Sequence, residues 1–310
     1  MKKTVAIITS DPESVNYEII KKSLFFFKKK TKNNYLFIES KELLKINLIN
    51  KKFIKIKDVK WYKNKKKEYL QKCFEEFINL YNSKKVHALI NLPLSKKDFL
   101  DNSFPGVTEY ISNKFMCSGK ETMLLYNDLF SVSPLTTHVK VKDISKNIKI
   151  KKIINNFQNI LNFYKKTIKI KKPLIGILGL NPHNATDSYA NSEEQKIIIP
   201  SIKKLKRKFK KNIIGPICSD TSFIKREEKK INSLIGMYHD QVLTTFKYIH
   251  KFSAINITLG LPFIRVSPDH GTASDIIGKN RANPESFLYC LKFFEKFHKT
   301  IWKKNMGKTF

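Results

Sequence analysis

The stretch from Thr4 to Ile38, TVAIITSDPESVNYEIIKKSLFFFKKKTKNNYLFI, decides the fold class of this chain. The apolar run Val5–Ile8 predicts a buried β-strand, Ile19–Phe27 predicts a helix, and Tyr35–Ile38 predicts a second strand. Strands that alternate with helices are typical of a largely parallel sheet covered by helices. The opening therefore indicates an α/β protein.

The alternation continues beyond this stretch. A helix is expected from about Glu68 to Tyr81, and the short apolar run Val86–Ile90 ends at Asn91-Leu92-Pro93. Residues 39–67 are lysine-rich and irregular, so the pattern does not place their strands.

A second block begins near Phe104-Pro105-Gly106. It contains helices expected at about Ile144–Tyr164 and Ser192–Lys208, with a strand at Leu174–Leu178 between them. The closing segment Pro284–Lys303 has apolar residues at helical spacing and is expected to pack against the first lobe.

The helix expected at Ser192–Lys208 carries its own start and break signals. Ser192 is expected to cap it, with Glu193 and Glu194 near the positive end of the helix dipole. Pro200 falls inside the pattern and is expected to kink or split the helix.

Length and composition favour a folded enzyme of two lobes. The 310 residues and 41% hydrophobic content suffice for a large core. No apolar run approaches the roughly 20 residues that span a bilayer, and Val5–Ile8 is shorter than a signal-peptide core of roughly 7–15 residues. Four scattered cysteines without a C-x-x-C pair argue against a disulfide framework and a cysteine zinc cluster. A reduced, cytoplasmic setting is therefore expected.

The formal net charge of +34 raises the alternative of a nucleic-acid-binding protein. Only four of the 60 basic residues are arginine, the residue preferred for bidentate recognition of phosphates and bases. The lysines fall in short runs over the whole chain and not on one stripe. These lysines are interpreted as solvent-exposed surface residues. The protein is expected to bind polyanions nonspecifically at low salt.

Three histidines lie in short sequence motifs whose polar residues are not required for the packing of a helix or a sheet. They are His138 in LTTHV, His183 in GLNPHN and His239 in GMYHDQ, and an apolar run precedes each, at Leu124–Leu129, in ILGL and at Leu234–Met237. Each imidazole is therefore expected near the end of a buried element, where open α/β sheets place their ligands. Three imidazoles with an open position are typical of a catalytic metal site.

The segment 255–273, INITLGLPFIRVSPDHGTA, is apolar but carries Asn256, Arg265, Asp269 and His270. Each of these groups would destabilise the fold if it were buried without a partner. For Arg265, one of only four arginines, an anion site is favoured over pairing with a surface carboxylate. For Asp269, a structural loop cap and a functional role remain equal alternatives.

Several sequence motifs, in order along the chain, resemble the motifs of one known family. They are GLNPH, the pattern G-P-x-x-x-D-T-x-F at Gly215–Phe223, MYHDQ, NITLGLPFIR and S-x-D-H-G-T-A. Together they resemble 4-hydroxythreonine-4-phosphate dehydrogenase, the PdxA family of pyridoxal phosphate biosynthesis. The resemblance covers nearly the whole chain and is strongest from about Thr136 to Phe287.

The resemblance implies a fold like that of isocitrate and isopropylmalate dehydrogenases, with two α/β/α lobes and a cleft between them. The first lobe is expected to comprise residues 1–103 and 276–310. The second, residues 104–275, is expected to carry the metal ligands and the dimer interface. The family also implies a homodimer whose active sites are shared between subunits.

The implied activity is NAD- or NADP-dependent oxidation of 4-phosphohydroxy-L-threonine to 2-amino-3-oxo-4-(phosphooxy)butanoate. This product loses CO2 and gives 3-amino-2-oxopropyl phosphate. One divalent metal per site, Zn²⁺, Mg²⁺ or Co²⁺, would lower the pKa of the substrate alcohol and polarise the carbonyl formed from it. Because no Rossmann G-x-G-x-x-G occurs, the nucleotide is expected against loops peculiar to this fold.

The family motifs assign roles to particular residues of this chain. His138, His183 and His239 fall on the metal ligands and, with Lys247, on the catalytic positions. Lys247 and Arg265 are expected to neutralise the substrate phosphate and carboxylate. His87, His250 and His298 are expected to be structural or solvent-facing. Substrate contacts fall on Val107, Thr108, Lys247, Asn256 and Arg265, and the nucleotide site is placed at Asp269, Gly271 and Thr272.

The chain departs from the family pattern in four loops. Ser10–Glu18 stands where the family has G-D-P-x-G-I-G-P-E, and Asn91–Lys96 stands where it has T-G-P-x-x-K. Val107 replaces the histidine of G-H-T-E, and Asn184–Tyr189 replaces a glycine-rich loop. Side chains in such loops can obstruct a ligand, so weaker substrate or cofactor binding is expected.

Two other functions remain open from the sequence. A related metal-dependent oxidative decarboxylase would act on another phosphorylated hydroxy acid, because the altered loops lie where substrate is selected. A catalytically impaired basic binding protein would keep the fold without the activity, although three retained histidines argue against it. Neither a specific nucleic acid nor a membrane is expected as a partner.

Overall fold

The computed structural model describes residues 2–9, 11–44, 55–62, 64–100, 103–185 and 191–302, and divides into two compact units. Unit 1 comprises residues 1–110, 252–256 and 262–310, and unit 2 comprises residues 111–251 and 257–261. The sequence placed all of residues 104–275 in the second lobe. The structure assigns 262–275 to unit 1, because the strand Ile264–Pro268 pairs with a strand of that unit.

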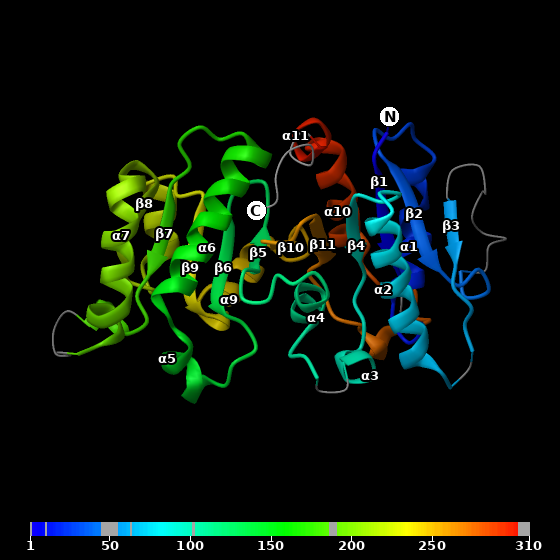
Figure 1. Ribbon diagram of the computed structural model, residues 1–310, viewed down its shortest axis with the longest axis horizontal. Helices are drawn as coiled ribbons and strands as arrows, with labels where there is room; N and C mark the ends of the chain where they lie inside the picture. The colour runs from blue at the N-terminus through cyan, green and yellow to red at the C-terminus, as the bar shows by residue number, and fades with distance from the viewer. Residues whose placement is uncertain are drawn as a thin grey trace. The chain divides into compact units, whose positions relative to one another are not determined.

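Unit 1 is built on a parallel sheet with the strand order β3-β2-β1-β4-β11 (Figure 1). β1 (Thr4–Ile8) lies between β2 (Asn34–Glu39) and β4 (Ala88–Asn91) and pairs with both in parallel. β3 (Lys55–Asp58) pairs with β2, and β11 (Ile264–Pro268) pairs with β4, again in parallel. The predicted opening strands and the α/β class are confirmed.

The helices of unit 1 follow the predicted alternation. α1 and α2 confirm the helices expected near Ile19–Phe27 and Glu68–Tyr81. The closing segment forms α10 and α11, and α10 packs against β11 and α1 as expected. The described helices are α1 (Asn16–Phe27), α2 (Lys66–Asn82), α3 (Lys96–Leu100), α10 (Glu285–Lys296), α11 (His298–Trp302) and α4 (Val107–Lys114), which begins in unit 1 and ends in unit 2.

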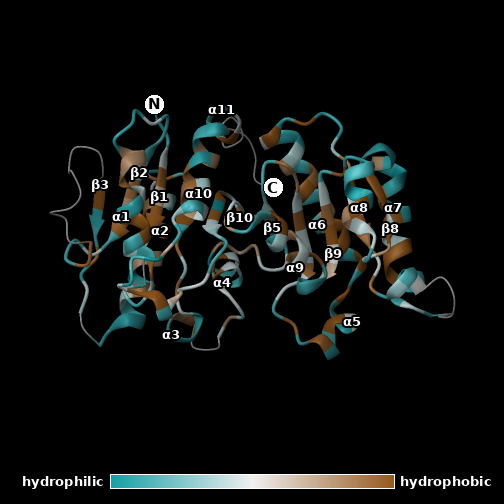
Figure 2. Ribbon diagram, turned by 180° about the vertical axis from the view of Figure 1, so that it is seen from behind, coloured by the Kyte–Doolittle hydropathy of each residue, from teal (hydrophilic) through white to brown (hydrophobic). Residues whose placement is uncertain are grey.

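Apolar strand residues and aromatic rings form the core of unit 1. Val5, Ile7 and Ile8 of β1 are completely buried, and Figure 2 shows this strand in brown. The ring of Phe27 on α1 meets the ring of Phe37 on β2 edge-on, at 5.5 Å between centroids. Such pairs contribute about 0.5–1.5 kcal/mol beyond the area they bury, so α1 is held against the sheet.

Unit 2 has the strand order β5-β6-β9-β7-β8. β5 (Thr122–Tyr126) is antiparallel to β6 (Ser131–Thr136), and the remaining pairs are parallel. The other strands are β7 (Ile175–Leu178), β8 (Ile213–Ile217) and β9 (Ser233–Tyr238), and β10 (Ile255–Leu259) is divided between the units. The helices are α5 (Ile144–Asn147), α6 (Ile150–Phe163), α7 (Ile199–Phe209), α8 (Ser222–Glu228) and α9 (His239–His250).

Two helices of unit 2 differ from the sequence prediction. The helix expected at Ile144–Tyr164 is broken, because Lys149 has extended backbone between α5 and α6. The helix expected at Ser192–Lys208 opens with a π-helical turn, Glu194–Ile198, before α7. Pro200 lies at the start of α7, where a missing N–H is tolerated. The backbone stays helical from the π-helical turn into α7, so the expected split at this proline is not seen.

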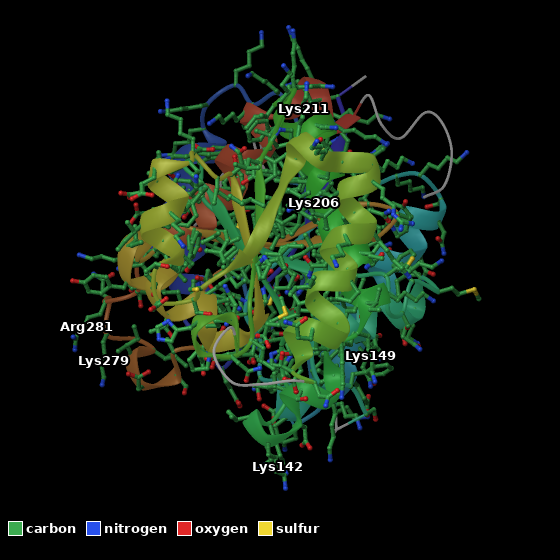
Figure 3. All side chains as sticks on the ribbon, turned by 90° about the vertical axis from the view of Figure 1, so that its left-hand side faces the viewer. Lys142, Lys149, Lys206, Lys211, Lys279 and Arg281 are labelled. Carbon is green, nitrogen blue, oxygen red and sulfur yellow. The ribbon has the colours of Figure 1, made fainter. Side chains whose placement is uncertain are left out.

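The lysine-rich surface lies on exposed side chains of many elements. Figure 3 shows Lys142, Lys149, Lys206 and Lys211 pointing outward from unit 2, and all four are exposed. Among the described residues, no helix combines the length and apolar character needed to cross a bilayer.

His250 is part of an aromatic cluster in unit 2, and its burial there is expected to make the stability of the protein depend on pH. Its ring is 6% exposed and packs on Phe246 and Phe130, with centroids at 4.6 and 4.9 Å. Burial, and then the charge of Arg226, lower the pKa of His250. Because the unfolded ring titrates near pH ~6.5, its stabilising contribution is present above that pH and is lost as pH falls through the lowered folded value.

The free energy of unfolding, measured with urea between pH 7.5 and pH 5, should therefore fall with acidity. His250→Phe should make this fall shallower, whereas His298→Phe in unit 1 should leave the unit 2 contribution unchanged. An equally steep fall in the His250 variant would contradict this assignment.

Candidate active site

The three histidines predicted from the sequence follow three consecutive strands of unit 2. β6, β9 and β7 are parallel neighbours in the sheet. His138 lies two residues after β6, His183 lies five residues after β7, and His239 directly follows β9. Since the carboxyl ends of parallel strands meet at one edge of a sheet, all three loops belong to the same edge.

The predicted position of these histidines at the ends of buried strands is confirmed, with one correction. The strand before His138 is Ser131–Thr136, whereas the run Leu124–Leu129 covers the end of β5 and the turn after it. β5 is antiparallel to β6, so its carboxyl end lies at the other edge. His138 and His183 are exposed, and the His239 side chain is 41% exposed, so the imidazoles are accessible to a ligand.

A buried carboxylate holds the loop that leads to His183. Glu194 is completely buried, and its Oε1 accepts hydrogen bonds from the amides of Leu180 and Asn181 at 2.7 and 2.8 Å. The side-chain amide of Asn181 donates to Glu194 Oε2 at 2.8 Å. Burial opposes ionisation, but the hydrogen bonds outweigh it and lower the pKa of Glu194. The sequence pattern assigned Glu194 only a helix-dipole role, because this contact spans 14 residues.

The turn that carries His183 has left-handed backbone. The φ angles of His183 and Asn184 are 51° and 59°, a region that few residues other than glycine adopt. Asn184 Nδ2 donates to Cys218 Sγ at 3.1 Å, which fixes the turn against the end of β8. A Cβ at Gly179 would lie 2.2 Å from Asn184 Oδ1, so a larger residue at the start of this loop would displace the Asn184 side chain.

The orientation of His239 leaves one ring nitrogen for a ligand. Its Nδ1 lies 2.6 Å from Asp240 Oδ1. An ionised carboxylate can only accept, so Nδ1 carries the proton, and in a neutral ring Nε2 would then present its lone pair. A carboxylate on the second nitrogen is the usual support of a metal-binding histidine.

The donor chemistry of this edge fits a divalent cation, since accessible neutral imidazoles bind Zn²⁺ and Co²⁺ well. Within the described part of one chain, however, no three His, Cys, Asp or Glu side chains lie close enough to hold a metal ion. Among the residues that the structure describes, His138, His183 and His239 of one chain therefore do not form a three-ligand group.

A second set of predicted residues meets in unit 1 around Arg265. This residue of β11 is 4% exposed; its Nε donates to Asn91 Oδ1 and its NH1 to Thr108 Oγ1, each at 2.7 Å. Burial lowers the pKa of Arg265 to about 10, against the opposing effect of the Glu109 carboxylate. The structure thus brings Arg265 and Thr108 together, and adds Asn91 at the end of β4, which the motifs did not identify.

The other predicted substrate residues are distributed over both units. Val107 is the first residue of α4, beside Thr108. Asn256 lies on β10 in unit 1, and its Oδ1 is buried without a hydrogen-bond partner among the described residues. Lys247 is exposed on α9 in unit 2.

The predicted nucleotide-binding residues lie in the loop after β11. The amide of Asp269 donates to Ser286 Oγ at 2.8 Å, and Thr272 O accepts from the amide of Val15 at 3.1 Å. A Cβ at Gly271 would meet no atom within 4 Å, so this exposed glycine borders open space in the described structure. The loop is therefore anchored at both ends and open at its middle.

Comparison with known proteins places the chain in a family. The family model described as pyridoxal phosphate biosynthetic protein PdxA matches residues 2–293. The chain belongs to the PdxA family. It is 36% identical over 310 residues to 4-hydroxythreonine-4-phosphate dehydrogenase of Sulfurihydrogenibium, a match that covers 92% of this chain and 95% of the relative.

Solved structures agree with the PdxA fold. The 4-hydroxythreonine-4-phosphate dehydrogenase of Klebsiella pneumoniae has a TM-score of 0.78 at 24% identity, and the match covers 94% of this chain and 98% of that one. Isocitrate dehydrogenase of Methylococcus capsulatus has a TM-score of 0.53 at 8% identity, over 95% and 85% of the two chains. The fold predicted from the family resemblance is confirmed.

The side chains that replace PdxA glycines near residue 14 turn inward. Ser14 and Asn16, which stand at two of these glycine positions, are at most 3% exposed, so they do not extend outward over the loop. Asn16 Nδ2 donates to Thr9 O and to Pro93 O, each at 2.7 Å, and so joins the loops after β1 and β4. Both side chains are buried within the loop, and the weaker ligand binding expected from these replacements stays a prediction. Of the loop Asn184–Tyr189, residues 186–189 lie outside the described residues.

Proposed function

We propose that this PdxA protein oxidises 4-phosphohydroxy-L-threonine with a nicotinamide cofactor and a divalent metal, in pyridoxal phosphate biosynthesis. The product, 2-amino-3-oxo-4-(phosphooxy)butanoate, then decarboxylates to 3-amino-2-oxopropyl phosphate. The observation that carries the proposal is the PdxA match over residues 2–293. The names of the curated relatives and the histidine edge of unit 2 support it.

The metal would be held by His138, His183 and His239, with Zn²⁺, Co²⁺ or Mg²⁺ as the candidates. When bound, the cation supplies a Lewis acid that favours the ionised form of the substrate hydroxyl. Asp240 keeps Nε2 of His239 available, and Glu194 fixes the backbone before His183. The role of the protein in this chemistry is therefore to orient the three imidazoles.

The anionic groups of the substrate require positive charge and hydrogen-bond donors. Arg265 and Thr108, joined at 2.7 Å, would supply both in unit 1. Val107 and Asn256 are proposed to lie beside the substrate there. Lys247 would supply a mobile charge from α9 in unit 2. The nicotinamide nucleotide, NAD or NADP, would bind at Asp269, Gly271 and Thr272, where the backbone is exposed at Gly271.

The working protein is proposed to be a cytoplasmic homodimer whose subunits share each site. In such a dimer, a second copy would supply the ligand that the described part of one chain does not bring to the other two. Residues 104–275 include the proposed metal ligands, and this region is proposed to contribute the dimer interface.

The reaction itself tests the proposal. The purified protein should convert 4-phosphohydroxy-L-threonine and NAD or NADP into the reduced cofactor, CO2 and 3-amino-2-oxopropyl phosphate in equal amounts. Turnover of a different phosphorylated hydroxy acid in preference would identify the related decarboxylase instead. Salt-dependent retention on DNA without bound metal or turnover would identify a basic binding protein.

Restoring the family histidine tests the departure at position 107. Val107 forfeits a polar contact that is typically worth about 0.5–1.5 kcal/mol, so Val107→His should lower KM by about 2- to 10-fold. Steady-state kinetics of both proteins measure this change, with Val141→His, at an exposed valine in unit 2, as the matched control. An ordinary wild-type KM that Val107→His fails to lower would show that this contact is not needed.

A further inference from the structure

Four exposed lysines lie on the connection between His138 and helix α6 in unit 2. Their ammonium groups form no ion pair with another side chain in the part of the chain that the structure describes: Lys140, Lys142, Lys146 and Lys149. Asp143 is the only acidic residue at positions 129–186 of the sequence. We call these four lysines the lysine rim, because their positive charge is largely uncompensated within their own segment.

The lysine rim lies at the same edge of the unit 2 sheet as the candidate site. It begins two residues after His138, in the loop at the carboxyl end of β6. Ser145, in the middle of the rim segment, donates a hydrogen bond to Glu193 Oε1. Glu193 Oε2 in turn accepts from Asn181 Nδ2 at 3.0 Å, two residues before His183. The rim therefore borders the loops of two of the three histidines.

The carboxylates near this edge are already engaged by other groups of unit 2. The hydrogen bond from Ser145 is the largest of the effects that lower the pKa of Glu193, so this carboxyl is ionised and paired with donors. Glu194 is completely buried against backbone amides, and Asp240 faces the ring of His239. The ammonium groups of the rim have no such partners among the described residues, so they are the charges available to an anion in solution.

We propose that the lysine rim attracts the anionic substrate from solution to the carboxyl edge of unit 2 and thereby lowers its KM. The proposal rests on the proposed function, which places the substrate at the histidine edge. A phosphate monoester carries about −1.5 to −2 charges near pH 7, while the carboxylate and ammonium groups of 4-phosphohydroxy-L-threonine cancel. Clustered charges of one sign raise the association rate of an oppositely charged ligand by about 10- to 1000-fold, and salt weakens the effect. The rim would act at a distance, in addition to the direct contacts proposed for Arg265 and Lys247.

A second group of lysines in unit 2 offers a matched control. Its members are also exposed and lie at the end of α7 and in the 3-10 turn after it: Lys206, Lys208, Lys210 and Lys211. The next element, β8, begins at Ile213 and is parallel to β7, so these lysines belong to the amino edge of the sheet, opposite the histidines. Figure 3 shows Lys142 and Lys211 at opposite ends of unit 2. Replacement of either group by glutamine removes the same amount of charge from the protein.

The test measures KM and kcat of the full-length, metal-loaded protein for 4-phosphohydroxy-L-threonine at several ionic strengths. The rim variant carries Lys140→Gln, Lys142→Gln, Lys146→Gln and Lys149→Gln, and the control variant carries the same change at the four lysines of the amino edge. At an ionic strength of about 0.1 M, where charges are screened beyond about 10 Å, the rim variant should raise KM at least about 3-fold without a change of kcat. The control variant should stay within about 1.5-fold of wild type, and all three proteins should agree near 1 M, where the screening length is about 3 Å.

Equal rises of KM in the rim and control variants would show that only the net charge matters, and would overturn the inference. A wild-type KM in the rim variant, or a rise that persists near 1 M, would overturn it as well. If a fourfold variant does not fold, the single reversals Lys142→Glu and Lys211→Glu decide the question in the same way, since only the first should raise KM. No turnover by the wild type would overturn the proposed function together with this inference, whereas turnover with equal losses overturns the inference alone.

Discussion

Replacement of His183 by alanine is expected to abolish metal-dependent turnover while leaving the fold intact. The side chain is exposed, so its removal opens no cavity, and the left-handed turn around it is held by Asn184 and the loop before it by Glu194. Loss of a proposed ligand should weaken divalent cation binding by more than about 100-fold, beyond the range of residues that only support ligands. Since a bound cation stabilises transition-state charge by several kcal/mol, kcat/KM should fall by about 1000-fold or more.

Metal content, Co²⁺ titration and steady-state kinetics check this prediction. His87→Ala is the matched control, because this imidazole lies in unit 1 and its Nδ1 accepts only a long hydrogen bond from the Thr4 amide, at 3.4 Å. The control should keep wild-type metal content and turnover. A His183→Ala protein with undiminished metal binding and activity would remove His183 from the site.

Replacement of Arg265 by methionine is expected to damage substrate binding most among the unit 1 residues. Loss of one partner from a buried, hydrogen-bonded charge contact costs about 2–5 kcal/mol, so kcat/KM should fall by about 30-fold or more. The loss should appear mainly as a higher KM for the phosphorylated substrate. Arg265→Lys should recover part of it, because lysine restores the charge but cannot bond Asn91 and Thr108 in the same fork.

The stability of this variant must be measured beside its kinetics. Asn91 Oδ1 and Thr108 lose a donor in Arg265→Met, so the free energy of unfolding should fall by about 1–3 kcal/mol. Arg281→Met, at an exposed arginine that points outward in Figure 3, is the control for loss of one positive charge. A KM for substrate that is unchanged in Arg265→Met would show that Arg265 is structural.

The fold was predictable where strands are apolar and helices carry a clear period. β1, β2 and β7 and the helices α1, α2 and α10 match runs visible in the sequence. β3 escaped prediction because its sequence, KIKD, is polar and its residues are mostly exposed at the end of the unit 1 sheet. The break at Lys149 has no glycine or proline signal, so it could not be placed from local sequence.

Only those residues of the candidate site that lie in recognisable sequence motifs could be predicted. His138, His183 and His239 stand at strand ends, as the apolar runs before His183 and His239 indicated. The supports of the site were not predictable, because Glu194 and Asn91 act through contacts that form only after folding. Asn91 lies 174 residues from Arg265 in the chain, and no local pattern joins them.

The side chains that replace the family glycines show a further limit of prediction from the sequence. The sequence indicated only that side chains in this loop can obstruct a ligand, since glycines allow close approach of backbone. The structure adds that the Asn16 amide donates to Thr9 O and Pro93 O, and so joins the two loops. These contacts form only after folding, so the sequence could not predict them.

The central claim is that the three imidazoles serve one divalent cation on which dehydrogenation depends. The most direct measurement is the rate of reduced cofactor formation from 4-phosphohydroxy-L-threonine by chelator-stripped protein, before and after addition of Zn²⁺, Co²⁺ or Mg²⁺. We predict negligible turnover without metal and restored turnover with at least one of the three ions. Full turnover by the stripped protein, or none under any condition, would contradict the account.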